Sequence, residues 1–278
     1  MAELTEEQPT APTTTNPSVV GDLRLHEFKS RIFRNSRMLR VWLPSGYSDA
    51  GNAQRYPVLY LNDGQNLFDR ATAFAGVEWQ VDETADRLIR EGAIPPLIVV
   101  GIDNTQGERM REYVPYRTFS PPILRPLGKR YPEFLAREVM PFVQQNYRTA
   151  KGPEHTGLGG SSLGGLISLY TAIAIPGIFG RLQIESPSLF ISNGQILKDS
   201  RRFREWPARV FLGIGGKETG REDKNFELVD DVRELAESLR RSGLHEQRLR
   251  LRIDEDAGHN EGAWAARFPE ALAFLFGK

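Results

Sequence analysis

The sequence predicts an α/β protein with a mostly parallel central sheet that helices flank on both faces. Short apolar runs of strand length alternate along the 278-residue chain with longer segments of helical periodicity, as in a parallel sheet built from strand–helix units. We see no internal repeat and no interior linker that would divide the chain. We therefore expect a disordered tail over residues 1–20, rich in Thr, Pro, Ala and Glu, and a single domain over residues 21–278.

The first half of the chain supplies an edge pair and two buried strands. Residues 23–33 and 38–44 alternate polar and apolar side chains, as strands of an antiparallel edge pair do. Continuous apolar runs within residues 56–63 and 96–101 suit strands that are buried on both faces. Helices are expected over residues 79–89 and 131–147, the second of them bent at Pro141.

The second half continues the alternation of strands and helices. A short strand before Gly160 leads into a helix rich in Leu, Ile and Ala over residues 163–174. A proline-rich stretch over residues 118–128 is expected to be a long surface loop. Further strands are expected at residues 181–185, 208–213 and 248–253, and further helices at residues 228–239 and 263–276.

Composition excludes several classes of function. The chain has 36 Lys and Arg against 36 Asp and Glu residues, so no net charge favours nucleic acid or an anionic membrane as a partner. It has no cysteine, which removes disulfides, thiolate metal sites and a cysteine nucleophile. No stretch is apolar enough to span a membrane, and the N-terminus lacks the apolar core of a secretory signal. We therefore expect a cytoplasmic protein.

The most informative motif is Gly160-Ser-Ser-Leu-Gly164, which fits the G-x-S-x-G nucleophile elbow of serine hydrolases. In such an elbow a strand turns abruptly into a helix, and the central serine, here Ser162, sits at the apex. Side chains two residues before and after it would collide, so both positions are glycine. The alternative is a glycine-rich phosphate-binding loop, but no Lys follows in the arrangement of a P-loop. Ser162 is thus the expected nucleophile.

The base is sought among four histidines. In this architecture the acid and then the histidine follow the serine along the chain, which counts against His26 and His155. His245 precedes the last strand and therefore lies at the wrong end of the sheet. His259 follows that strand, where a loop at the carboxyl edge can present a base to Ser162. We expect His259 to accept the serine proton and return it to the leaving alcohol.

The acid should follow the strand at residues 208–213. Glu218 is the first carboxylate after it and is the first choice. Glu222 and Asp223 are rivals in the same loop, and Asp254 is a rival near His259.

The oxyanion hole needs two backbone N–H groups that face the developing negative charge. One is expected from Leu163, directly after the nucleophile, and the other from the loop that follows the strand ending at Leu61. In that loop Gly64 allows the backbone to turn in closely, which leaves the N–H of Gln65 as the second donor.

Several further motifs together resemble the esterase D-like family, a branch of the α/β-hydrolases. The resemblance extends from about residue 23 to the C-terminus. The segments that carry it are Tyr60-Leu-Asn-Asp-Gly-Gln-Asn-Leu-Phe68, Val100-Gly-Ile-Asp-Asn104, Arg109-Met-Arg-Glu-Tyr-Val-Pro115, Gly159-Gly-Ser-Ser-Leu-Gly-Gly165, Ser186-Pro-Ser-Leu189, Gly215-Gly-Lys-Glu218 and Gly258-His-Asn260.

The resemblance implies an α/β-hydrolase fold and a Ser–acid–His triad without a metal or organic cofactor. By position, the family's nucleophile matches Ser162, its histidine matches His259 and its acid matches Glu218. Many relatives have Asp at the position of the acid, so Asp223 stays a rival. The segment that begins at Arg109 resembles a substrate-side loop of the family, in which Arg109, Arg111 or Tyr113 would line the cleft. Trp79 and Phe68 are candidates for stacking on a substrate ring, with core packing as the alternative for each.

We therefore expect a serine carboxylic-ester hydrolase that acts through an acyl-enzyme on a small or carbohydrate-linked ester. One alternative is a siderophore trilactone esterase, whose anionic catecholates could be received by Arg109, Arg111, Arg117 and Arg125. An acyltransferase is a second alternative. A catalytically silent scaffold that acts as a binding module is a third, from another class, and the joint presence of Ser162 and His259 argues against it.

Overall fold

The protein is described by a computed structural model over residues 18–118 and 125–277. Most of the tail predicted over residues 1–20, and residues 119–124 of the predicted surface loop, lie outside the described residues. None of the helices in the described ranges combines the length and apolar character needed to cross a lipid bilayer.

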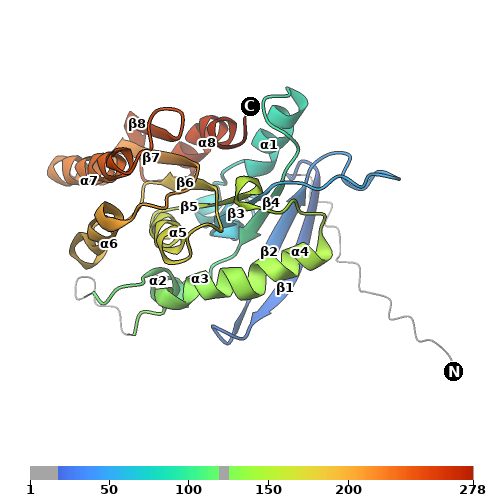
Figure 1. The fold of residues 1–278 in the computed structure, drawn as a ribbon, viewed down its shortest axis with the longest axis horizontal. Coiled ribbons are helices and arrows are strands. Elements are labelled where there is room, and N and C mark those ends of the chain that lie inside the picture. Colours follow the sequence, from blue (N-terminus) through green and yellow to red (C-terminus); the bar gives the residue numbers. More distant parts are fainter. Residues whose placement is uncertain (1–17, 119–124, 278) are drawn as a thin grey trace.

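The described chain forms an eight-stranded sheet in the order β1-β2-β4-β3-β5-β6-β7-β8. The two pairings that involve β2 are antiparallel, and all the others are parallel. This confirms the predicted antiparallel edge pair and the mostly parallel sheet (Figure 1). The strands are β1 (Asp22–Ser30), β2 (Asn35–Leu43), β3 (Val58–Asn62), β4 (Ile98–Ile102), β5 (Thr156–Ser161), β6 (Arg181–Glu185), β7 (Arg209–Lys217) and β8 (Leu249–Gly258).

Helices flank both faces of the sheet, as predicted (Figure 1). Helices α1 and α8 pack on each other and cover one face, while α3 to α7 lie on the other. The sequence did not predict α2 or α6, two helices that follow the carboxyl ends of β4 and β6. The helices are α1 (Val81–Arg90), α2 (Arg109–Tyr113), α3 (Tyr131–Phe134), α4 (Met140–Asn146), α5 (Leu163–Ala174), α6 (Ile191–Arg202), α7 (Glu222–Arg241) and α8 (Glu261–Phe276).

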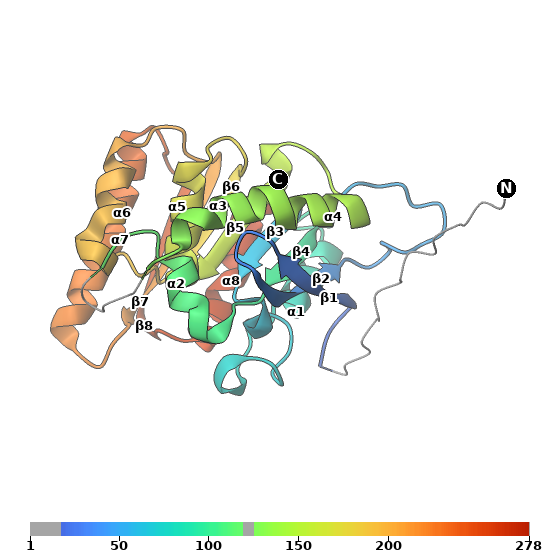
Figure 2. The same cartoon turned by 90° about the horizontal axis from the view of Figure 1, so that it is seen from below.

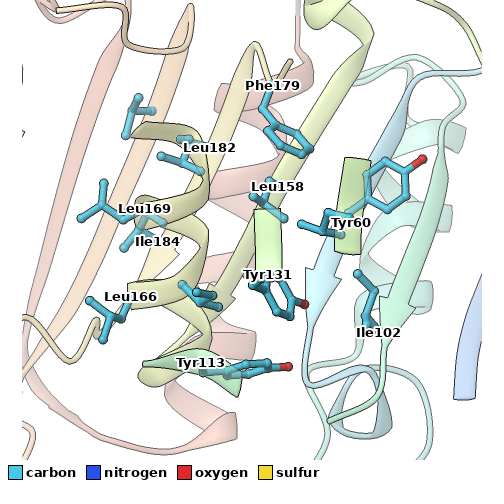
Figure 3. Packing of buried hydrophobic residues seen from close by; sticks show 14 of the residues in the cluster. Tyr60, Ile102, Tyr113, Tyr131, Leu158, Leu166, Leu169, Phe179, Leu182 and Ile184 are labelled. Atoms are coloured by element: carbon cyan, nitrogen blue, oxygen red, sulfur yellow. The ribbon is translucent and has the colours of Figure 1, made fainter. Parts of the chain in front are cut away.

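Two apolar cores lie on the two faces of the sheet. Within β3, Val58 and Tyr60 belong to one core and Leu59 and Leu61 to the other, because successive side chains of a strand point to opposite faces. On the first face α5 packs Leu166 and its neighbours against β6, as Figure 3 shows. Burial on both faces explains why the central strands appear in the sequence as continuous apolar runs.

The helix predicted over residues 131–147 is interrupted by one wide turn. A π-helical turn, Leu135–Val139, joins α3 to α4, which lie in line (Figures 1 and 2). Pro141 is the second residue of α4, and the bend expected there is not seen, since α3 and α4 lie in line. A proline inside a helix lacks an N–H and crowds the carbonyl four residues earlier, and a wider turn accommodates both defects.

Candidate active site

Five neighbouring strands bring polar groups to one edge of the sheet. Because β3, β5, β6, β7 and β8 are parallel, the segments that follow them all leave at their carboxyl ends. The residues that follow these strands include Gln65, Ser162, Ser188, Glu218 and His259. Gln65, Ser162 and His259 line one cleft of about 560 Å³.

Ser162 sits at the junction between β5 and α5 in a strained backbone conformation. Its φ of 56° and ψ of −122° are rare for a residue with a side chain. Its N–H donates to the carbonyl of Glu185 in the neighbouring strand, at 2.9 Å. A Cβ on Gly160 would lie 3.0 Å from the backbone of Gly164, and one on Gly164 would lie 3.0 Å from the Asp63 carboxylate. The two glycines therefore allow the tight turn that presents Ser162.

Glu218 and His259 form a hydrogen-bonded pair. The Nδ1 atom of His259 lies 2.5 Å from a carboxylate oxygen of Glu218, whose side chain is 2% exposed. The other oxygen accepts from Ser186 Oγ at 2.7 Å and from the N–H of Gly215 at 2.6 Å. Burial alone would raise the pKa of Glu218, but the hydrogen bonds from His259, Ser186 and Gly215 outweigh it and lower the pKa. Glu218 is thus held ionised, and it orients the imidazole of His259.

The rival carboxylates are placed elsewhere. Asp223 pairs with Arg221 at 2.6 Å, and its side chain is 59% exposed. Glu222 is also exposed, and Asp254 lies within β8 opposite Gly215. In residues 18–118 and 125–277, none of these three carboxylates forms a hydrogen bond or an ion pair with His259. The geometry therefore favours Glu218 as the acid.

Ser188 is a neighbour of the nucleophile to which the sequence reasoning gave no role. Its hydroxyl lies 3.3 Å from the hydroxyl of Ser162, and its N–H donates to the carbonyl of Ser162 at 3.1 Å. Over the described residues the Ser162 hydroxyl is hydrogen-bonded to Ser188 and not to His259. In free enzymes catalytic hydrogen bonds are often long and tighten when substrate binds.

The two backbone groups expected at the oxyanion hole lie at the ends of two neighbouring strands. Leu163 is the first residue of α5, so its N–H has no acceptor within the helix. Gln65 lies in a short 3-10 turn, Gly64–Asn66, after β3. A Cβ on Gly64 would lie 2.6 Å from the backbone of Gly101 in β4, so this turn packs directly on the sheet.

An ion pair anchors the turn that carries Gln65. Asp63, which adopts a left-handed conformation before the turn, accepts two hydrogen bonds of 2.7 Å from Arg109. The side chain of Asn104 donates to the same carboxylate at 2.6 Å, and its backbone N–H donates to the side chain of Gln65 at 3.2 Å. Arg109 was expected to contact substrate. It lines the cleft, but its guanidinium is engaged with Asp63.

We expect Arg109→Met to lower kcat by about 10- to 100-fold with little change in KM, because the turn that carries Gln65 loses its anchor. The loss in kcat should already be seen with neutral esters, and anionic esters should lose more because the Asp63 carboxylate is left without its cation. Arg111→Met is the matched control, since Arg111 lies on the same helix and pairs on the surface with Glu108 and the carbonyl of Arg125, away from Asp63. Steady-state kinetics on both variants check this. An unchanged kcat for neutral esters in Arg109→Met would contradict the anchoring role of Arg109.

The other side chains expected at the cleft lie outside it. Tyr113 is fully buried beside Tyr131 in the core (Figure 3). Trp79 and Phe68 are buried in the core beneath α8, where Trp79 packs on Trp264. These three aromatic residues therefore serve packing, because their rings already have apolar neighbours. Of the arginines weighed for an anionic ligand, Arg117 and Arg125 line a separate cavity.

Comparison with known proteins agrees with this architecture. The profile of the family described as "Putative esterase" matches residues 30–275. The protein YbbA of Bacillus subtilis is 27% identical over 256 residues, which cover 87% of this chain and 94% of YbbA. An endo-1,4-beta-xylanase/feruloyl esterase of Xylanibacter ruminicola is 23% identical over 261 residues, which cover 92% of this chain and 31% of that protein.

Among solved structures, the enterobactin esterase of Shigella flexneri has a similar fold. It superposes with a TM-score of 0.68 at 20% sequence identity, and the match covers 91% of this chain and 58% of that one. At this identity the likeness concerns the fold alone. The family profile spans most of the chain. The chain has an α/β-hydrolase fold and belongs to the putative esterase family.

Proposed function

We propose that the protein is a serine carboxylic-ester hydrolase that works through an acyl-enzyme. The observation that carries this proposal is the 2.5 Å contact between Glu218 and His259, together with the position of His259 in the same cleft as Ser162. An ionised carboxylate on Nδ1 leaves Nε2 free to accept a proton, which is the state that a general base requires.

In the first half of the reaction Ser162 Oγ attacks the ester carbonyl while His259 Nε2 takes its proton. The carbonyl oxygen becomes an oxyanion, which the N–H groups of Gln65 and Leu163 stabilise. The C–O bond to the alcohol then breaks, and the imidazolium of His259 protonates the departing oxygen. Glu218 stabilises that imidazolium without taking the proton.

In the second half water takes the place of the alcohol. His259 removes a proton from the water as it attacks the acyl carbonyl, and the acid is released when Ser162 Oγ recovers its proton. The relatives support an ester as the substrate, because one is described as a feruloyl esterase and a structural neighbour as an enterobactin esterase. Small or carbohydrate-linked esters are therefore the substrates to test first.

A panel of nitrophenyl acetate, butyrate and longer-chain esters, with methyl ferulate and an acetylated sugar, tests the proposal. We expect turnover of at least one ester with release of acid and alcohol in equal amounts. Added alcohols or sugars distinguish hydrolysis from transfer, because an acyltransferase would form a new ester in place of the acid. Failure of folded protein to cleave any ester or to react with an active-site phosphonate would contradict the proposal.

A further inference from the structure

The cleft that contains Ser162 also contains a carboxylate with no role in the proposed triad. Glu261 is the first residue of α8 and lies two positions after His259. It lines the cleft together with Ser162 and His259, and only 9% of the residue is exposed. A carboxylate that lines the same cleft as the nucleophile acts on a charge that a bound substrate carries near it.

The contacts of Glu261 hold it in place without neutralising it. Its carboxylate accepts from the side-chain amide of Asn66 at 3.2 Å, and the Oδ1 atom of Asn66 accepts from the N–H of Phe74 at 3.0 Å. Across the described ranges no basic side chain forms an ion pair with Glu261. Burial raises the pKa of Glu261 and the nearby Asp63 charge adds to the rise, while its own backbone N–H and the charges of His259 and Arg109 offset only part of it. An ionised Glu261 therefore gains from a hydrogen-bond donor or a cation brought by a ligand.

Apart from Glu261, the charged side chains that line the cleft neutralise each other. The cleft lining carries two carboxylates, Asp63 and Glu261, and one guanidinium, Arg109. Arg109 makes both of its short hydrogen bonds to Asp63, so that pair is neutral as a unit. With His259 neutral, one negative charge remains, and it belongs to Glu261. The ring of Phe74, 74% exposed, lines the same cleft and offers an aromatic face, which attracts cations.

We propose that Glu261 is a specificity-determining residue, which makes the cleft select neutral and cationic esters over anionic ones. The inference rests on the proposed ester hydrolysis and adds a substrate class to it. An anionic group close to Glu261 meets an unneutralised charge of the same sign in a partly desolvated site. A hydroxyl group instead adds a hydrogen bond to the one from Asn66, and an ammonium group supplies the cation that the described residues do not.

Two ester series that vary in charge but little in shape test this inference. In the first the charge is on the alcohol, with acetylcholine, its neutral isostere dimethylbutyl acetate and anionic acetoxyethanesulfonate. In the second it is on the acyl group, with nitrophenyl butyrate and nitrophenyl hemisuccinate. The wild-type protein should have a kcat/KM at least about tenfold higher for the neutral than for the anionic ester in one series or both. Salt should reduce this difference, because it screens the charge.

Glu261→Gln removes the charge and keeps an acceptor for Asn66. We expect the ratio of neutral to anionic kcat/KM to fall by about tenfold, and the ratio of acetylcholine to the neutral isostere to fall as well. Glu270→Gln is the matched control. It makes the same change on α8, but Glu270 lies on the surface beside Arg250 and Arg252, so the ratio should not change.

The outcomes separate this inference from the proposed function. Hydrolysis of every ester with an unchanged ratio in Glu261→Gln would overturn the role of Glu261 and leave the esterase intact. A wild-type preference for the anionic esters would do the same. No turnover of any ester by folded protein would overturn the proposed function and this inference with it. If the variant fails to fold, the wild-type protein still tests the inference, because a ratio of neutral to anionic kcat/KM that salt does not reduce would contradict it.

Discussion

Replacement of Ser162 by alanine is expected to lower kcat for ester hydrolysis by at least about a thousandfold. The variant loses the only atom that can form the acyl-enzyme in the proposed mechanism, while the cleft and the oxyanion donors stay in place. Background catalysis by bound water and the oxyanion hole sets the residual rate. Steady-state kinetics on an ester that the wild-type protein cleaves, with circular dichroism to show that the variant is folded, check this prediction.

The adjacent serine supplies a matched control for this variant. Ser161 is the last residue of β5, also lies at the cleft, and differs from Ser162 by one position in the turn. Ser161→Ala makes the same chemical change, and we expect it to reduce kcat by less than about tenfold, as for a residue outside the acyl-transfer step. Full activity in Ser162→Ala, or a larger loss in Ser161→Ala, would show that the nucleophile has been assigned to the wrong residue.

Replacement of Glu218 by glutamine is expected to lower kcat by about 10²- to 10⁴-fold. The amide of glutamine can donate a hydrogen bond to Nδ1 of His259. That bond favours the tautomer with its proton on Nε2, which cannot accept the proton of Ser162. The exchange is nearly isosteric, so Ser186 and Gly215 keep an oxygen to bond. The loss should therefore come from chemistry rather than from unfolding.

Asp223→Asn tests the rival assignment with the same change from acid to amide. Asp223 forms an exposed ion pair with Arg221 at the start of α7, and such pairs contribute little to stability. We expect kcat and KM of Asp223→Asn to stay within about twofold of the wild-type values. A larger loss in Asp223→Asn than in Glu218→Gln, measured with the same ester, would transfer the role of the acid to Asp223.

The sheet and most helices could be predicted because their signal is local. Apolar residues that recur every second position in a strand, or every 3.6 positions in a helix, show that one face of that element is buried. The continuous apolar runs of β3 and β4 show that both faces of these strands are buried. Two strands extend beyond their predicted ends, since β7 reaches Lys217 and β8 reaches Gly258. From the sequence alone, the glycines at 215 and 216 suggest that the strand ends in a turn. In the structure they allow a close approach to β8, where a Cβ on Gly215 would lie 2.2 Å from a carbonyl oxygen.

The contacts around the cleft could not be predicted because they join residues far apart in the chain. Asp63 and Arg109 are separated by 46 positions, and Asn66 and Glu261 by 195. No periodicity reports such a pair, and the type of residue alone does not say whether an arginine faces a ligand or a carboxylate of its own chain. The positions of Ser162, Glu218 and His259 could be proposed from the sequence, because each follows a strand whose place in the sheet the sequence indicates.

The proposed mechanism requires an activated serine at position 162, and a fluorophosphonate probe tests this most directly. The probe reacts with serines that a neighbouring base activates and that an oxyanion hole serves. Intact mass and peptide mapping of the folded protein should show one adduct, located on Ser162, and none in His259→Ala or Ser162→Ala. A folded wild-type protein without an adduct, or with one on another serine, would contradict the account.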